Sequence, residues 1–214
     1  MSSKLSIHEV FLDKGNKAAE QVARQVMENK KLLPHLYDGV TGSHKRIKNA
    51  AAKTLQILSV RVPKRLYPQL DFFLQLIDGD DTILKWIALD VVGNVSSVDT
   101  ENQINKKILQ QLYDLLSDES MITAAHAIAA LGRIAVHKPR VRKEVTAHLL
   151  CVENIQRNPE CRDILIGHTI LALTEYIDPL RDKKAVLAFA QRALKNSRPA
   201  TRKKAEKFLK PFAR

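Results

Sequence analysis

The sequence predicts an all-α protein, a right-handed α-α superhelix of about five helix pairs preceded by an N-terminal capping helix. An internal repeat is the main observation, because a small residue recurs every 36 to 42 positions and large apolar residues follow it four and seven positions later. Composition agrees, since 45% of the chain is hydrophobic but only 5% is aromatic, which gives an aliphatic core suited to helix packing. The repeated small residues are Ala51, Ala88, Ala127, Thr169 and Ala205.

The elements follow from this register as one repeat domain spanning residues 1–214. Residues 1–15 form an N-terminal segment that can be flexible, and residues 16–31 form a helix that caps the first repeat. Each small residue lies in the second helix of a pair, where a larger side chain would push two closely crossing helices apart. The predicted helix pairs are 33–60, 63–98, 101–137, 139–178 and 179–214.

Helix boundaries are indicated by turn and capping residues. The helix expected over 63–78 ends with Phe73, Leu76 and Ile77, which lie on one helical face. Asn158-Pro159 and Asp178-Pro179 each combine an N-cap residue with proline at the first helical position, where the missing N–H costs nothing. Both dipeptides are therefore predicted to begin helices.

Two second helices resemble those of HEAT repeats, a family of armadillo-like helical repeats. The resemblance rests on the segment from Leu84 to Gly93 and on Ile122 to Ile134, which contains Ala130-Leu131-Gly132. It extends in coarse pattern over residues 33–214, although Thr174 and Lys210 replace the glycine in the last two pairs. The resemblance implies a HEAT-like solenoid that acts as a non-enzymatic scaffold. A minority of the family binds nucleic acid, and one branch comprises DNA glycosylases for alkylated purines.

Second helices usually line the concave side of HEAT-like arrays, and here two of their columns are charged at the ends and apolar in the middle. This pattern favours a groove for an apolar, partly acidic helix or extended peptide of a protein partner. The alternative is that the apolar side chains are buried inside the protein itself. The candidate groove residues are Trp86, Asp90, Ile128, Ala129, Ile166, Ile170 and Leu171.

A second candidate surface is basic. The chain carries a net charge of +12, which is uneven: residues 79–118 carry −4 and residues 159–214 carry +7. Basic clusters on the last helix and near other helix ends are suited to nucleic acid or another polyanion, although a terminal repeat also needs charge simply to stay soluble. The candidate polyanion-binding residues are Lys45, Arg46, Lys48, Arg140, Arg142, Lys143, Arg202, Lys203, Lys207 and Lys210.

No motif indicates catalysis, and we expect neither an enzyme nor a cofactor. Trp86 and Asp90 lie one helical turn apart, and HEAT-like glycosylases use an acidic residue with aromatic neighbours, but a lone pair of this kind is usually an ordinary surface feature. His126 and His168 occupy equivalent positions in successive second helices, where they could meet. Packed side chains are the simpler interpretation, and no metal site is predicted.

Cysteine content and hydropathy bear on the compartment. With only Cys151 and Cys161, a disulfide framework is not expected, and no apolar run approaches the ~20 residues of a membrane span. The first residues lack the uninterrupted apolar stretch of a signal peptide. We therefore expect a cytoplasmic monomer without membrane association, whose protein partner the sequence does not identify.

Overall fold

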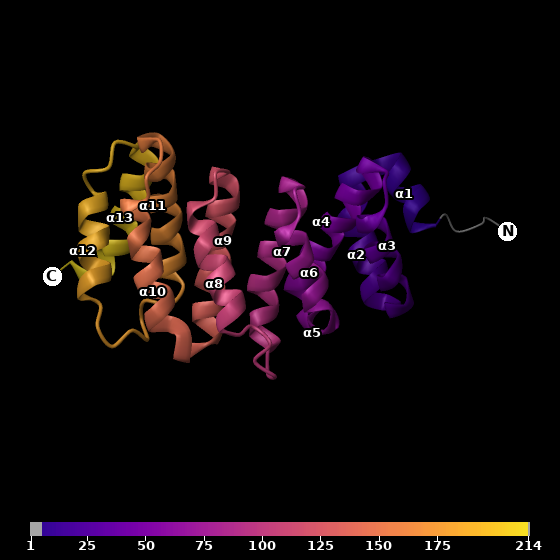
Figure 1. Cartoon of the computed structure of the whole chain (residues 1–214), viewed down its shortest axis with the longest axis horizontal. Helices are drawn as coiled ribbons and strands as arrows, with labels where there is room; N and C mark the ends of the chain where they lie inside the picture. The colour runs from indigo at the N-terminus through magenta and orange to yellow at the C-terminus, as the bar shows by residue number, and fades with distance from the viewer. Residues whose placement is uncertain (1–5, 214) are drawn as a thin grey trace. The chain divides into compact units, whose positions relative to one another are not determined.

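The computed structural model describes residues 6–213, and all regular secondary structure in that range is helical. The predicted all-α class is therefore confirmed. The chain divides into two compact units, residues 1–98 and residues 99–214, which are described separately (Figure 1). Among the described residues, no helix is both long and apolar enough to span a membrane.

The N-terminal unit contains two helix pairs, α3 with α4 and α6 with α7, preceded by α1 and α2. Between the pairs and at the ends lie short 3₁₀ turns. The elements are α1 (Ile7–Lys14), η1 (Gly15–Ala18), α2 (Ala19–Glu28), η2 (Lys30–Leu32), α3 (Leu33–Thr41), α4 (Lys45–Arg61), α5 (Pro63–Leu66), η3 (Tyr67–Gln69), α6 (Leu70–Asp78), α7 (Thr82–Val95) and η4 (Ser96–Val98).

The N-terminal segment contains more structure than the sequence indicated. Residues 1–5 lie outside the described range, but residues 7–14 form α1 rather than a flexible lead. Ser6 and Glu9 make a reciprocal capping box, which satisfies two backbone N–H groups that the helix itself leaves unpaired. Phe11 is fully buried, and α1 contacts α3 and α4. Burial of this aromatic ring holds α1 on the first helix pair.

The C-terminal unit contains three helix pairs: α8 with α9, α10 with α11, and α12 with α13. Figure 1 shows these helices standing side by side. The elements are α8 (Lys106–Asp114), η5 (Leu115–Ser117), α9 (Met121–His137), η6 (Pro139–Val141), α10 (Arg142–Leu150), η7 (Cys151–Asn154), α11 (Pro159–Thr174), α12 (Lys184–Ala193), α13 (Pro199–Leu209) and η8 (Lys210–Phe212).

The helices depart from the predicted boundaries at two places, and proline explains the first. The helix expected over 63–78 is divided into α5, η3 and α6 around Pro68, which lacks an N–H and cannot continue the ladder of hydrogen bonds. Asn158 caps α11 as predicted, since its side chain accepts a hydrogen bond from the Glu160 N–H. The prediction for Asp178-Pro179 is wrong. α12 begins only at Lys184, whose N–H donates to the Asp182 side chain.

The column of small residues lies in the core, as the repeat predicts. Ala51, Ala88, Ala127, Thr169 and Ala205 are all fully buried. Helices approach most closely where glycine faces a small residue. A Cβ placed on Gly132 of α9 would lie 2.8 Å from the Cβ of Ala172 in α11, closer than carbon atoms tolerate. Contact between these two helices therefore requires glycine at position 132.

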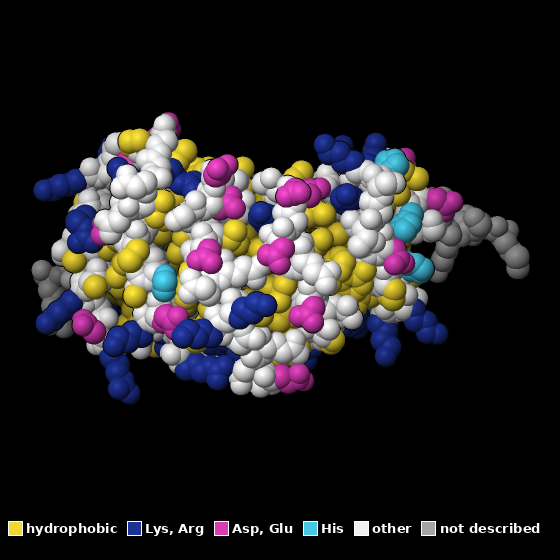
Figure 2. Space-filling model, in the orientation of Figure 1, with side chains coloured by type: hydrophobic (Ala, Val, Ile, Leu, Met, Phe, Trp, Pro, Cys, Tyr) yellow, Lys and Arg dark blue, Asp and Glu magenta, His cyan; other side chains and the backbone are white. Residues whose placement is uncertain are grey.

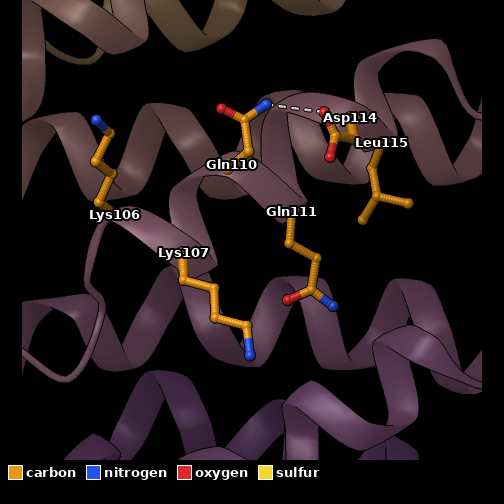
Figure 3. A pocket seen from close by; sticks show the side chains of 6 residues that line it. All are labelled: Lys106, Lys107, Gln110, Gln111, Asp114 and Leu115. Atoms are coloured by element: carbon orange, nitrogen blue, oxygen red, sulfur yellow. Dashed lines mark hydrogen bonds between the residues drawn. The ribbon is translucent and has the colours of Figure 1, made fainter.

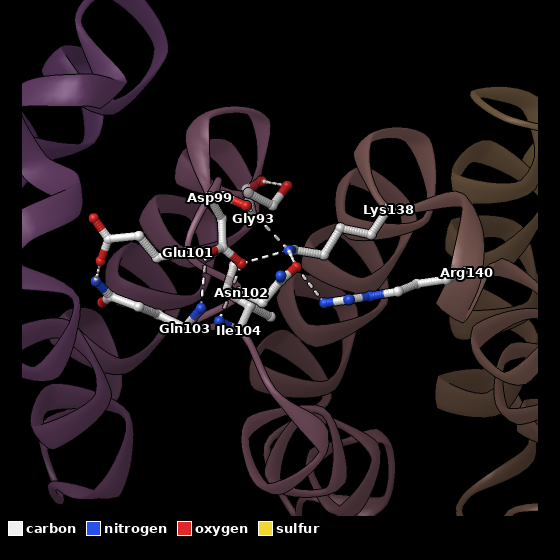
Figure 4. Close-up of polar contacts among 9 residues, drawn as sticks. Gly93, Asp99, Glu101, Asn102, Gln103, Ile104, Lys138 and Arg140 are labelled. Carbon is white, nitrogen blue, oxygen red and sulfur yellow. Dashed lines mark hydrogen bonds and ion pairs between the residues drawn. The ribbon is translucent and has the colours of Figure 1, made fainter.

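The start of the C-terminal unit is fastened by a buried ion pair. The Nζ atom of Lys138 lies 2.5 Å from Oδ2 of Asp99, and both side chains are almost inaccessible (Figure 4). The Asp99 carboxylate also accepts hydrogen bonds from the backbone N–H groups of Gln103 and Ile104. Asn102 adopts a left-handed backbone conformation with φ of 56°, which asparagine tolerates better than most residues. These bonds connect the segment before α8 to the turn after α9.

Candidate interaction surface

The second helices of the C-terminal unit share a stripe that is not buried against the rest of the unit. α11 contacts α9 on one side and α13 on the other, so the three helices lie in a row. On each helix the stripe recurs at intervals of three and four residues, as one helical face requires. We call this stripe the open face. Its residues are Ile122, His126, Ala129 and Arg133 of α9, Ile164, His168 and Leu171 of α11, and Lys204 and Lys207 of α13.

The apolar part of the open face is centred on α9 and α11. Leu171 is 47% exposed and Ile122 is 42% exposed, while Ala129 and Ile164 are half-buried. Large aliphatic side chains with this exposure are uncommon in the unit, because most of its leucine and isoleucine side chains are in the core. An apolar partner could remove these side chains from water.

Three of the predicted groove residues do not belong to the open face. Ile128 is fully buried and Ile170 is 1% exposed, so the expectation that they extend an exposed apolar centre is wrong. Each directly precedes a residue of the open face, and one step along a helix turns the side chain by ~100°. Ile166 is half-buried but lies five residues before Leu171, on another side of α11. Of the candidates in this unit, the structure places Ala129 and Leu171 on one surface.

The polar part of the open face is a row of three side chains from successive helices. His126, His168 and Lys204 occupy the same position of the repeat, one residue before the small-residue column. Lys204 reaches over α11, since its Nζ atom lies 3.3 Å from the place that a Cβ of residue 167 would occupy. Burial, and then the positive charges of Lys204 and His126, hold the pKa of His168 below its ordinary value. Burial and Arg198 likewise lower the pKa of Lys204.

The remaining groove candidates, Trp86 and Asp90, belong to α7 of the N-terminal unit. Trp86 is half-buried, whereas Asp90 is buried and its carboxylate accepts a hydrogen bond from the Gln56 side chain of α4. Asp90 therefore connects two second helices within its unit. A carboxylate in this position holds helices together, and its geometry offers no support for a glycosylase-like acid.

The candidate polyanion-binding arginines all make hydrogen bonds within the protein, although Arg46 and Arg140 are exposed. Arg46 donates a hydrogen bond to the Asp13 carbonyl at the end of α1, and Arg140 donates one to the Asn102 side chain. Arg142 donates to the carbonyls of residues 135 and 136 near the C-terminus of α9, and Arg202 donates to those of residues 196 and 197 before α13. Apart from that of Arg140, these guanidinium groups satisfy backbone acceptors at helix ends and turns.

The candidate lysines are more accessible. Lys48 is half-buried, and the others are exposed, namely Lys45, Lys143, Lys203, Lys207 and Lys210. Lys203, Lys207 and Lys210 lie at successive turns on one side of α13 and η8 and border a surface hollow of about 640 Å³. Figure 2 shows further Lys and Arg side chains along the lower edge of the C-terminal unit. Five of the six candidate lysines and two of the four candidate arginines are therefore exposed.

A surface hollow that no sequence pattern predicted lies beside α8. It measures about 660 Å³ and is lined by Lys106, Lys107, Gln110, Gln111, Asp114 and Leu115 (Figure 3). The Gln110 amide donates a hydrogen bond to the Asp114 carboxylate at 2.9 Å. The residues that line this hollow come from α8 and the turn after it. They do not form the convergent set of buried polar groups that a small-molecule site usually provides.

Within residues 6–213, His126 and His168 do not belong to a group of side chains that could bind a metal ion. His126 and His168 are close enough to interact electrostatically, as the sequence suggested they could. No group of three His, Cys, Asp or Glu side chains in that range is arranged to hold a metal ion. Cys151 and Cys161 are free thiols.

Several residues of the open face were missed as interaction candidates. The sequence predicted His126 and His168 to be packed side chains and placed Lys204 only in the basic stretch of the last helix, and it singled out neither Ile122 nor Ile164 as an interaction residue. The sequence does contain a signal for the polar row, because His126, His168 and Lys204 each directly precede an aligned small residue of the repeat. The exposure of Ile122 needed the structure.

Comparison with solved structures identifies the fold class. A designed armadillo repeat protein matches 97% of this chain and 92% of its own, with a TM-score of 0.66 and 14% identity. Two further engineered proteins match with TM-scores of 0.60 and 0.61 and identities of 14% and 17%, covering 98% and 95% of this chain and 92% and 89% of theirs. No protein-family model and no curated protein matches the sequence. The protein therefore has an armadillo-like helical-repeat fold, as the resemblance to HEAT repeats implied.

Proposed function

We propose that the protein is a non-enzymatic interaction module and that the open face of its C-terminal unit binds an acidic, partly apolar segment of a protein partner. The observation that carries the proposal is the exposure of Leu171 and Ile122 among the positively charged side chains of the same surface. The unit has 21 Lys and Arg residues against 13 Asp and Glu residues, a net charge of +8. An acidic segment complements that charge, and its apolar side chains complement the leucine and isoleucine.

A defined peptide tests the proposal. Fluorescence anisotropy is measured with a fluorescein-labelled peptide of six Asp-Leu repeats and with its Lys-Leu counterpart. We expect the acidic peptide to bind and the basic peptide not to bind. Equal binding of both peptides, or binding of neither, would refute the proposed partner chemistry.

Matched leucine variants locate the surface. Leu171→Ser should weaken binding of the acidic peptide by about tenfold, because burying a leucine side chain stabilises a complex by ~1.5–3 kcal/mol. Leu12→Ser is the control, since Leu12 is 44% exposed on α1 of the other unit. Equal losses in the two variants would contradict binding at the open face.

A second candidate function is polyanion binding, which the exposed lysine row of α13 and η8 favours. Lys203, Lys207 and Lys210 could each neutralise a phosphate. Anisotropy with random single- and double-stranded 20-nucleotide oligonucleotides over a salt series tests it. A micromolar or tighter dissociation constant would support this function if the logarithm of the association constant falls linearly with the logarithm of salt concentration. Absence of binding at low salt would exclude it.

A further inference from the structure

We propose that the row formed by His126, His168 and Lys204 is a carboxylate-binding subsite, which makes capture of the acidic partner tighter as pH falls. The inference rests on the proposed function, because it names the groups of the open face that recognise the partner's acidic side chains. It adds a regulatory property that the apolar residues of the same surface cannot provide.

The three side chains are placed in a row across three helices. They come from α9, α11 and α13, and α11 contacts both of the other helices. The three side chains occupy the same position of the repeat. Packed helices lie ~8–10 Å apart, so a peptide crossing the three helices meets the three side chains in order. Ala50 and Ile87 hold the same repeat position in the N-terminal unit, so the polar row is confined to the C-terminal unit.

The surroundings of His168 favour a negatively charged ligand. Lys204 of α13 and His126 of α9 are the cationic and titratable groups that act on His168. α10, η7 and α12 also pack against α11. α10 carries Arg142, Lys143, Glu144 and His148, and α12 begins with Lys184. Arg192 of α12 and Glu153 of η7 form an ion pair, with the Arg192 guanidinium 2.6 Å from the Glu153 carboxylate. His168 therefore lies between the Lys204 ammonium group and the His126 imidazole, and a carboxylate from outside would be attracted to this row.

The pH dependence follows from this arrangement. Because burial and its neighbours lower the pKa of His168, the imidazole without a partner is largely neutral near pH 7. A bound carboxylate favours the protonated form and raises the pKa again. Binding then takes up protons, and the affinity increases as pH falls through the range between the bound and free pKa values. One unit of pKa difference corresponds to a tenfold change in affinity.

The test is the affinity for the labelled Asp-Leu peptide between pH 5.5 and pH 8, together with proton uptake from calorimetry in buffers of different ionisation enthalpy. Aspartate has an ordinary pKa of ~3.9, so the peptide remains ionised over this range. We expect binding to tighten by about three- to tenfold towards pH 5.5 with net proton uptake, because a bound carboxylate raises the pKa of His168. The double variant His126→Gln/His168→Gln should lose the pH dependence while binding persists. His44→Gln, an exposed histidine of the other unit, is the control and should retain it.

Lysine variants separate the fixed charge from the titrating groups. Lys204→Gln should weaken binding at every pH, whereas Lys203→Gln, which changes the neighbouring exposed residue, should have a smaller effect. Affinity that is independent of pH in the wild type, or unchanged pH dependence in the double histidine variant, would overturn the inference. If Leu171→Ser still weakens binding in that case, the proposed function stands alone. Failure of the wild type to bind at any pH refutes both.

Discussion

Replacement of Gly132 by alanine tests how closely the second helices pack. Helix propensity alone predicts a gain in stability of ~1 kcal/mol, because alanine is the better helix former. The structure predicts the opposite sign. The new methyl group would lie 2.8 Å from the Ala172 Cβ and 3.2 Å from its Cα, so α9 and α11 must separate. Overpacking of this kind costs ~1–3 kcal/mol, which leaves a net loss of up to ~2 kcal/mol.

The assay is urea unfolding of wild type and Gly132→Ala, followed by circular dichroism at 222 nm. We expect a lower midpoint with an unchanged slope, which would report a change in stability and not in the surface exposed on unfolding. Gly79→Ala is the matched control, because a Cβ there meets only ordinary contacts at 3.5 Å or more, and its stability should stay the same or rise slightly. If Gly132→Ala is more stable than wild type, the close approach of α9 and α11 is refuted.

Three further predictions concern ionisable groups. Asp99→Ala should lower stability by ~3–5 kcal/mol in chemical denaturation, because it leaves the Lys138 ammonium buried without its carboxylate, and a loss below ~1 kcal/mol would contradict this. The pKa of His168 is lower in the folded protein than the ~6.5 expected for the unfolded chain. The contribution of His168 to the free energy of unfolding is therefore fully present above pH ~6.5 and decreases as pH falls towards the folded-state pKa. Melting temperatures should therefore decrease less below pH 6.5 in His168→Gln than in wild type, and equal decreases would oppose this. Burial raises the pKa of Tyr176 to about 12, so stability should decline from pH 10 upward, and Tyr176→Phe should reduce the decline seen in alkaline melting curves.

Much of the fold could be predicted because repeat architecture leaves a local record in the sequence. The column from Ala51 to Ala205 is buried at all five positions, since close helix crossings admit only small side chains. Boundaries that depend on a single competing hydrogen bond were harder to predict. α12 begins at Lys184, five residues later than Pro179 suggested, and the Lys184 N–H donates a hydrogen bond to the Asp182 side chain. Both dipeptides offered the same local signal, and only Asn158 caps a helix.

The candidate surface could be predicted only in part, because exposure depends on a turn of ~100° per residue. Ala129 and Leu171 lie on one side of the second helices, whereas their neighbours Ile128 and Ile170 are in the core. An apolar helix carries no sequence signal that separates exposed from buried isoleucine. The arginine clusters were equally ambiguous, since Arg142 and Arg202 bind backbone carbonyls that the sequence does not reveal.

The most direct test of the account compares glutamate at two adjacent positions of α9. Ala129 is half-buried on the open face, whereas Ile128 is fully buried beside it. The measurement is the melting temperature of each variant together with its affinity for the Asp-Leu peptide. Ala129→Glu should melt within about 2 °C of wild type, as surface substitutions usually do, and bind the peptide at least about tenfold more weakly. Ile128→Glu should lose several kcal/mol of stability by burying a charge. Ala129→Glu protein that unfolds like Ile128→Glu, or that binds the peptide as wild type does, would contradict the central claim that this face is open and binds a partner.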